Sequence, residues 1–121
     1  MTKILIASDD LKIRTLVGHF FEVRGLTVLE AATLEEAVET ARSEQPAVAI
    51  LDSDTQSGID AFAAVKAIKR ESPGTKVILL VSDFNSRRQS EARRAADLVL
   101  MKDTTLSTTL GVAVVNFAGR A

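Results

Sequence analysis

Residues 47–52 read Ala-Val-Ala-Ile-Leu-Asp, and this stretch decides the fold. The uninterrupted apolar run 47–51 predicts a strand that is buried on both faces, as strands of parallel sheets are. Apolar side chains at Phe62, Val65 and Ile68 then share one face of a helix, which is expected to stop at Ser72-Pro73-Gly74. A buried strand followed by an amphipathic helix is the repeating unit of α/β folds.

The same unit is expected four more times along the chain. The additional strands are predicted at residues 3–7, 27–29, 76–81 and 98–101. The first helix, which ends near Gly25, carries one apolar stripe, formed by Ile13, Leu16, Val17, Phe20 and Phe21. The second helix begins at a capping box between Thr33 and Glu36 and continues to about residue 43. Five βα units predict a single α/β domain, a doubly wound (βα)5 parallel sheet with helices on both faces.

The last two helices differ in the apolar surface that they offer to the sheet. The fourth is expected at residues 86–96, and its inner face carries only alanines: Ala92, Ala95 and Ala96. The final helix carries a larger stripe: Leu106, Leu110, Ala113, Val114 and Phe117. The fourth helix is therefore expected to be the most weakly anchored.

Composition excludes several classes of function. The 121 residues fit one domain, 1–121, with no output domain, and 15 Lys and Arg against 16 Asp and Glu give a net charge of −1. There is no cysteine for disulfides, thiolate catalysis or zinc fingers, and a single histidine excludes a histidine-cluster metal site. The balanced charge and 4% aromatic content give no support for nucleic-acid binding. The longest apolar runs have five residues against about 18 for a membrane span, so neither membrane insertion nor a signal peptide is expected and the location is predicted to be cytoplasmic.

Polar side chains gather directly after the predicted strands. Asp9 and Asp10 follow the first strand, Asp52 and Asp54 lie at the end of the third, and Lys102 follows the fifth. Ser82 comes after the fourth strand. Ligands of open α/β sheets bind beyond the carboxyl ends of the strands, so this rim is the candidate site.

The residue types at this rim are suited to phosphoryl chemistry. Neighbouring carboxylates repel one another unless a cation lies between them, and Mg²⁺ prefers one or two carboxylates with carbonyl and water oxygens, so Asp9 and Asp52 are candidate ligands. A carboxylate such as Asp52 can attack phosphorus to form an acyl phosphate, while Lys102 neutralises the phosphoryl oxygens. Each aspartate taken singly fits equally well as a helix N-cap. The set of Asp9, Asp52 and Lys102 is much harder to explain by capping.

The chain resembles the receiver domains of two-component response regulators over its whole length. The motifs that carry the resemblance are Lys3-Ile4-Leu5-Ile6-Ala7-Ser8-Asp9-Asp10 with Ile13-Arg14, Val48-Ala49-Ile50-Leu51-Asp52, Gly58-Ile59-Asp60-Ala61-Phe62, and Ala95-Ala96-Asp97 through Leu100-Met101-Lys102. The resemblance implies a flavodoxin-like sheet with strand order 2-1-3-4-5. It also implies that Asp52 accepts a phosphoryl group from a histidine kinase or phosphotransfer protein and signals to a downstream effector protein. Asp9, Asp52 and the backbone carbonyl of Asp54 would bind Mg²⁺, and Lys102 would contact the phosphoryl group.

Several positions depart from the receiver pattern. Receivers usually carry acidic residues at both positions occupied here by Ser8 and Asp9. Asp10 could replace the missing ligand, although helix capping is the favoured role. The small hydroxyl residue that reads the phosphoryl group falls on Val81, so Ser82 can serve only if the fourth strand is extended or bulged. Five further departures are expected. The loop after Asp52 is longer, and receivers usually have proline, glycine, an aromatic residue and proline at the positions of Ser57, Ala61, Val99 and Asp103.

The sequence leaves other functions open. With these changes the domain could be a phosphorylation-independent pseudo-receiver that acts only through protein contacts. The run Asp52-Ser53-Asp54-Thr55 also resembles the nucleophile motif of haloacid dehalogenase-type phosphatases, with Asp52 as nucleophile and Asp54 as general acid, but the required acidic motif after Lys102 is missing. On the fourth helix, four arginines form a candidate partner face: Arg87, Arg88, Arg93 and Arg94. His19 lies off the apolar stripe and is expected at the surface.

Overall fold

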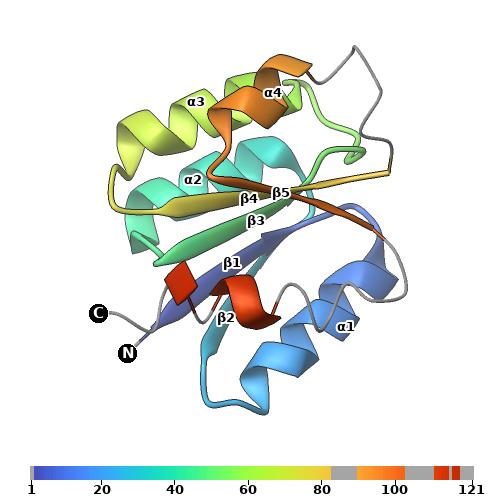
Figure 1. The fold of residues 1–121 in the computed structure, drawn as a ribbon, viewed down its shortest axis with the longest axis vertical. Coiled ribbons are helices and arrows are strands. Elements are labelled where there is room, and N and C mark those ends of the chain that lie inside the picture. Colours follow the sequence, from blue (N-terminus) through green and yellow to red (C-terminus); the bar gives the residue numbers. More distant parts are fainter. Residues whose placement is uncertain (1, 83–89, 103–110, 115, 118–121) are drawn as a thin grey trace.

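The computed structural model describes residues 2–82, 90–102, 111–114 and 116–117. Five parallel strands form one sheet in the order β2-β1-β3-β4-β5 (Figure 1). They comprise β1 (Lys3–Ala7), β2 (Thr27–Ala31), β3 (Val48–Asp52), β4 (Lys76–Val81) and β5 (Leu98–Met101). The strand order 2-1-3-4-5 confirms the predicted doubly wound receiver architecture.

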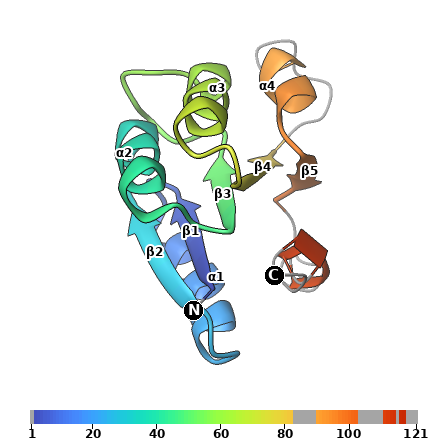
Figure 2. The ribbon, with the colours of Figure 1, turned by 90° about the vertical axis from the view of Figure 1, so that its left-hand side faces the viewer.

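Helices cover both faces of the sheet, as Figure 2 shows. On one face lie α2 (Leu34–Glu44), α3 (Ala61–Glu71) and α4 (Ser90–Ala95), and on the other lie α1 (Leu11–Glu22) and the helical residues 111–114 and 116–117. Each face has its own buried cluster. Alternate residues of β3 belong to the two clusters. Leu51 packs toward α2 and α3, whereas Ile50 packs toward α1. Among the described residues no helix is both long and apolar enough to cross a bilayer.

The inner face of α1 differs in one residue from the predicted core. Leu16 was expected on the inward stripe, but it is 61% exposed. The helix meets the sheet through Val17, Gly18 and Phe21, which are buried. Gly18 lies against β2, and a Cβ added there would be in ordinary van der Waals contact with Val28 Cγ1 at 3.5 Å. His19 is exposed, as predicted.

The remaining elements follow the predictions with small differences. Strand β2 extends to Ala31, two residues beyond the predicted end. One half of the predicted capping box is present at the start of α2, because Thr33 Oγ1 accepts from Glu36 N at 3.0 Å, and the Glu36 carboxylate accepts from the Thr33 hydroxyl at 3.4 Å. In α4, Ala92 is buried and Ala95 packs against the same cluster, as does Ala96, which directly follows the helix. The first part of that predicted helix, 86–89, lies outside the described residues, as do Leu106 and Leu110, whereas the predicted core residues Ala113 and Val114 are buried.

Asp97 joins three elements near the amino end of the sheet. Its carboxylate accepts from Val77 N at 2.7 Å and pairs with Lys69 of α3. Burial by itself raises the pKa of Asp97, but the hydrogen bonds from Lys69 and Val77 and the charges of Lys69 and Lys76 outweigh it and lower that pKa. The carboxylate therefore stabilises the fold above its unfolded pKa, and this contribution is lost as pH falls through the lower folded pKa.

We therefore predict that Asp97→Asn destabilises the protein at neutral pH and much less in acid. Asparagine keeps an oxygen for Val77 N but loses the charge that attracts Lys69. The free energy of unfolding in urea, measured for both proteins at pH 7 and near pH 3, is expected to differ at pH 7 by about 1–2 kcal/mol. A difference that stays constant over this range would contradict the prediction.

Candidate functional site

The carboxyl ends of the strands bring the predicted acidic residues and Lys102 to one rim. Asp52 is the last residue of β3, which lies between β1 and β4 in the sheet. Asp9 follows the end of β1, and Lys102 follows β5 and donates its backbone N–H to Val81 O at 2.9 Å. The strand order thus brings together side chains that are up to 93 positions apart in the chain.

Asp52 is buried and receives three hydrogen bonds. Its exposed fraction is 1%. Ser8 Oγ donates to Oδ2 at 2.7 Å, and Oδ1 accepts from Asp54 N at 3.0 Å and from Lys102 Nζ at 2.8 Å. A buried carboxylate is stable in the charged form only when such donors replace the lost water, and here one donor is a full positive charge.

Lys102 bridges two carboxylates. Its Nζ lies 2.8 Å from Asp52 Oδ1 and 2.7 Å from Asp54 Oδ2. Burial lowers the pKa of Lys102, but the bonds and charges of Asp52 and Asp54 more than reverse this and leave the pKa above its ordinary value. The ammonium therefore stays charged and lies where it can neutralise oxygens that are added to Asp52.

Asp9 holds the loop that follows Asp52. Asp9 is exposed, and its Oδ2 accepts a hydrogen bond from Gln56 N at 2.9 Å. The same loop is attached to the start of α2, because Leu34 N donates to Ser57 Oγ at 2.7 Å and Gly58 N donates to Glu35 Oε2 at 2.8 Å. These loop contacts were not predicted from the sequence, because they join residues 23 or 47 positions apart and belong to no recognisable motif.

Of the two roles considered for Asp10, the structure shows the capping role. Its side chain accepts from Lys12 N at 2.9 Å and caps α1. The backbone N–H of Asp10 donates to Ser8 Oγ at 3.1 Å. The Asp10 carboxylate is therefore engaged by α1, and its role as a metal ligand stays a prediction.

The predicted readout positions differ in burial. Val81 is fully buried at the end of β4, where it pairs with Met101, and the pairing register of β4 is regular from Lys76 to Val81. Ser82 comes after the strand and is exposed. The strand is not bulged, so a phosphoryl contact by Ser82 would need a local rearrangement and stays a prediction. Val99 is partly buried.

The oxygen atoms at the rim are of the kind that bind Mg²⁺, but they are few. Asp52 and Asp9 accept from the amides of Asp54 and Gln56, so both carboxylates flank the short loop that carries the Asp54 carbonyl. Two carboxylates and a carbonyl are oxygen ligands of the kind that Mg²⁺ takes, with water and phosphate oxygens completing its shell. Within the described residues no group of three or more acidic or histidine side chains could hold an ion. The residues therefore fit a site that is incomplete without added oxygens.

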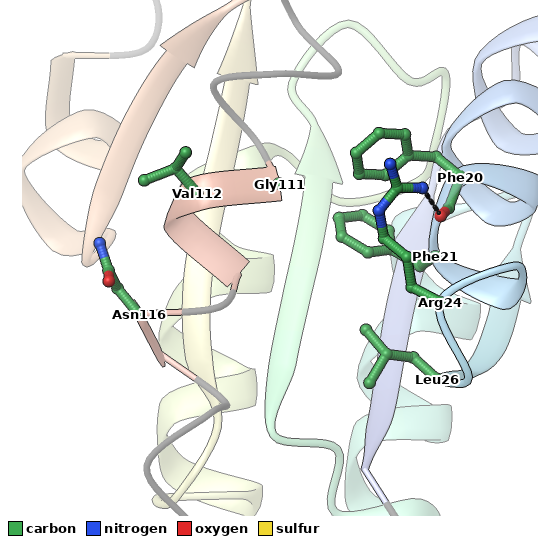
Figure 3. Close-up of a pocket in the computed structure, with 7 residues that line it drawn as sticks. All are labelled: Phe20, Phe21, Arg24, Leu26, Gly111, Val112 and Asn116. Atoms are coloured by element: carbon green, nitrogen blue, oxygen red, sulfur yellow. Dashed lines mark hydrogen bonds between the residues drawn. The ribbon is translucent and has the colours of Figure 1, made fainter.

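A separate apolar pocket lies between α1 and the C-terminal helical residues (Figure 3). Its volume is about 530 Å³, and its lining comprises Phe20, Phe21, Arg24, Leu26, Gly111, Val112 and Asn116. The guanidinium of Arg24 lies 3.6 Å from the centre of the Phe20 ring and also donates to Phe20 O. These lining residues include a cation, Arg24, but no acidic residue and no nucleophile that could accept a phosphoryl group.

The predicted partner face is described only in part. Arg93 is partly buried and Arg94 is exposed, both in the last turn of α4. Arg87 and Arg88 lie outside the described residues. The docking role of these arginines stays a prediction.

Comparison with known proteins identifies the family. The family model of the response regulator receiver domain matches residues 4–112. The chain belongs to the response regulator receiver domains. This receiver domain is also similar to solved structures over nearly its whole length. The response regulator TrrA of Thermotoga maritima, solved in complex with Mg²⁺-BeF, is 26% identical with a TM-score of 0.84, and the match covers 97% of this chain and 99% of TrrA. The chemotaxis protein CheY4 of Vibrio cholerae is 26% identical with a TM-score of 0.83, covering 97% and 98%.

A curated relative is longer than this receiver domain. A putative transcriptional regulator of Pseudomonas aeruginosa is 37% identical over 83 residues. The match covers 66% of this chain but only 39% of the regulator.

The phosphatase alternative loses its support, because the fold and the family are those of a receiver and the Asp54 carboxylate is paired with Lys102.

Proposed function

We propose that this receiver domain accepts a phosphoryl group on Asp52 from the phosphohistidine of a histidine kinase or phosphotransfer protein. The observation that carries the proposal is the buried Asp52 carboxylate paired with Lys102 at 2.8 Å. An Asp52 oxygen attacks phosphorus, the P–N bond to histidine breaks, and the histidine nitrogen leaves with the bonding electrons and takes up a proton.

The side chains around Asp52 have separate tasks in this proposal. Lys102 is already charged and oriented, so it can neutralise the transferred oxygens without reorganisation. Asp9, Asp52 and the carbonyl of Asp54 would hold Mg²⁺, which would supply further positive charge to the phosphoryl oxygens. The proposal includes the cytoplasmic location predicted from the sequence and a signal passed on through contacts with a downstream effector protein. It includes no enzymatic turnover.

The test is incubation with acetyl phosphate and MgCl2, followed by intact mass measurement. We expect a mass increase of one phosphoryl group that requires MgCl2. TrrA, whose structure contains Mg²⁺-BeF, is a suitable positive control. A protein that stays unmodified under conditions that label TrrA would contradict the proposal.

The second candidate is a pseudo-receiver that signals without phosphorylation. It is favoured by the contacts of Asp52, which already accepts a hydrogen bond from Ser8 and pairs with the charge of Lys102, and by Val81 in place of a hydroxyl residue. The unmodified outcome of the mass experiment would support this candidate.

A further inference from the structure

The hydroxyl of Ser8 is a fixed part of the site. Ser8 is fully buried between the end of β1 and the start of α1, and its backbone N–H donates to Ala31 O at 3.0 Å. Its Oγ donates to Asp52 Oδ2 at 2.7 Å and accepts from Asp10 N at 3.1 Å. The hydroxyl is therefore used as both donor and acceptor.

Ser8 completes the set of hydrogen-bond donors that the chain itself offers to Asp52. The carboxylate accepts from Ser8 on one oxygen and from Asp54 N and Lys102 on the other. Three donors, one of them cationic, satisfy a buried carboxylate without any ion. Asp9 is likewise engaged, because its Oδ2 accepts from Gln56 N.

A carboxylate at position 8 would replace the hydrogen-bond donor of Ser8 with a second negative charge beside Asp52. It would lie within hydrogen-bond distance of Asp52 Oδ2, where Ser8 Oγ now lies at 2.7 Å. Two carboxylates at that separation cannot both stay charged unless a cation lies between them. Serine removes this repulsion and also removes one ligand that would attract a divalent cation.

We propose that Ser8 makes the resting site independent of divalent cations. In the resting protein the affinity for Mg²⁺ is low, and it rises only when a phosphoryl group adds its own oxygens. The proposal rests on the proposed function only for that last step. The resting-state statement does not involve phosphorylation and depends on the hydrogen bonds that Ser8, Asp54 N and Lys102 donate to Asp52.

The test compares wild-type protein with Ser8→Asp and Ser8→Asn, and no phosphodonor is present. Asparagine has the size of aspartate without its charge, which makes Ser8→Asn the matched control. Thermal unfolding is followed by circular dichroism in EDTA and in excess MgCl2, and Mg²⁺ is titrated against the backbone amide NMR signals of Asp9, Asp52 and Asp54.

We expect the wild-type Tm to be equal in EDTA and in MgCl2. Ser8→Asp is expected to unfold at a lower temperature in EDTA, to recover in MgCl2, and to bind Mg²⁺ at least about tenfold more tightly than wild type because it adds one carboxylate ligand. Ser8→Asn should not respond to Mg²⁺. A Ser8→Asp protein that folds only with Mg²⁺ would support the proposal equally.

Two results would overturn the proposal. One is a wild-type Tm that is clearly higher in MgCl2 than in EDTA, and this measurement needs no variant to fold. The other is an equal Mg²⁺ response of Ser8→Asp and Ser8→Asn. Because acetyl phosphate is absent, a failure of phosphorylation on Asp52 leaves these measurements unchanged, and the two proposals fail separately.

Discussion

Asp52→Asn is expected to abolish incorporation of the phosphoryl group from acetyl phosphate while leaving the protein folded. The amide lacks the nucleophilic carboxylate, so no acyl phosphate can form. Its carbonyl oxygen can still accept from Ser8 or from Lys102, which preserves part of the network that holds Asp52 in wild type. Intact mass measurement, with circular dichroism to verify folding, gives the result directly.

Asp54→Asn is the matched control for that experiment. Asp54 is also an aspartate paired with Lys102, but it is exposed and lies two residues beyond the strand. This variant is expected to be labelled. Labelling of Asp52→Asn would show that the acceptor is not Asp52.

Lys102→Met is expected to lower both stability and phosphorylation. Methionine keeps most of the aliphatic side chain but removes the ammonium, so the buried Asp52 carboxylate retains only Ser8 and Asp54 N as donors. Loss of one partner from such a pair costs about 3 kcal/mol. The free energy of unfolding in urea measures this cost. The rate of labelling by acetyl phosphate is expected to fall by at least about tenfold, as one charged contact is removed from the transition state.

Two control variants separate charge from side-chain size. Lys12→Met removes an exposed lysine of α1 and should change the free energy of unfolding by no more than about 0.5 kcal/mol. Lys102→Arg keeps the positive charge and should recover part of the lost stability. If Lys102→Met is as stable as Lys12→Met, the ion pair does not stabilise the resting site as described.

The buried centre of the sheet was predictable because its strands carry uninterrupted apolar runs of four or five residues. The strands β1, β4 and β5 have the predicted bounds, and β3 differs by one residue at each end. The edge strand β2 was predicted too short, since one of its sides has no neighbouring strand and the exposed Glu30 interrupts the apolar pattern. The exposure of Leu16 was missed because the inner face of α1 uses Gly18, and glycine gives no hydropathy signal.

The site was predictable in its composition but not in its contacts. The topology of a parallel sheet brings Asp9, Asp52 and Lys102 to one rim whatever their rotamers are. The bond from Ser8 to Asp52 and the acceptance of Gln56 N by Asp9 depend on side-chain rotamers and on the path of one loop. Such details are decided by local geometry between segments far apart in the chain, so a single sequence does not contain a readable signal for them.

The strand order also determines when each part of the chain can gain its stability. β1 pairs with β2 on one side and with β3 on the other, so β1 has both of its neighbours only after residue 51 has been synthesised. β3 in turn gains its second neighbour only from residues 76–80. None of the five strands can pair through a tight hairpin, because parallel neighbours need a crossover. The folding rate of this domain is therefore limited by contacts between distant segments rather than by local turns.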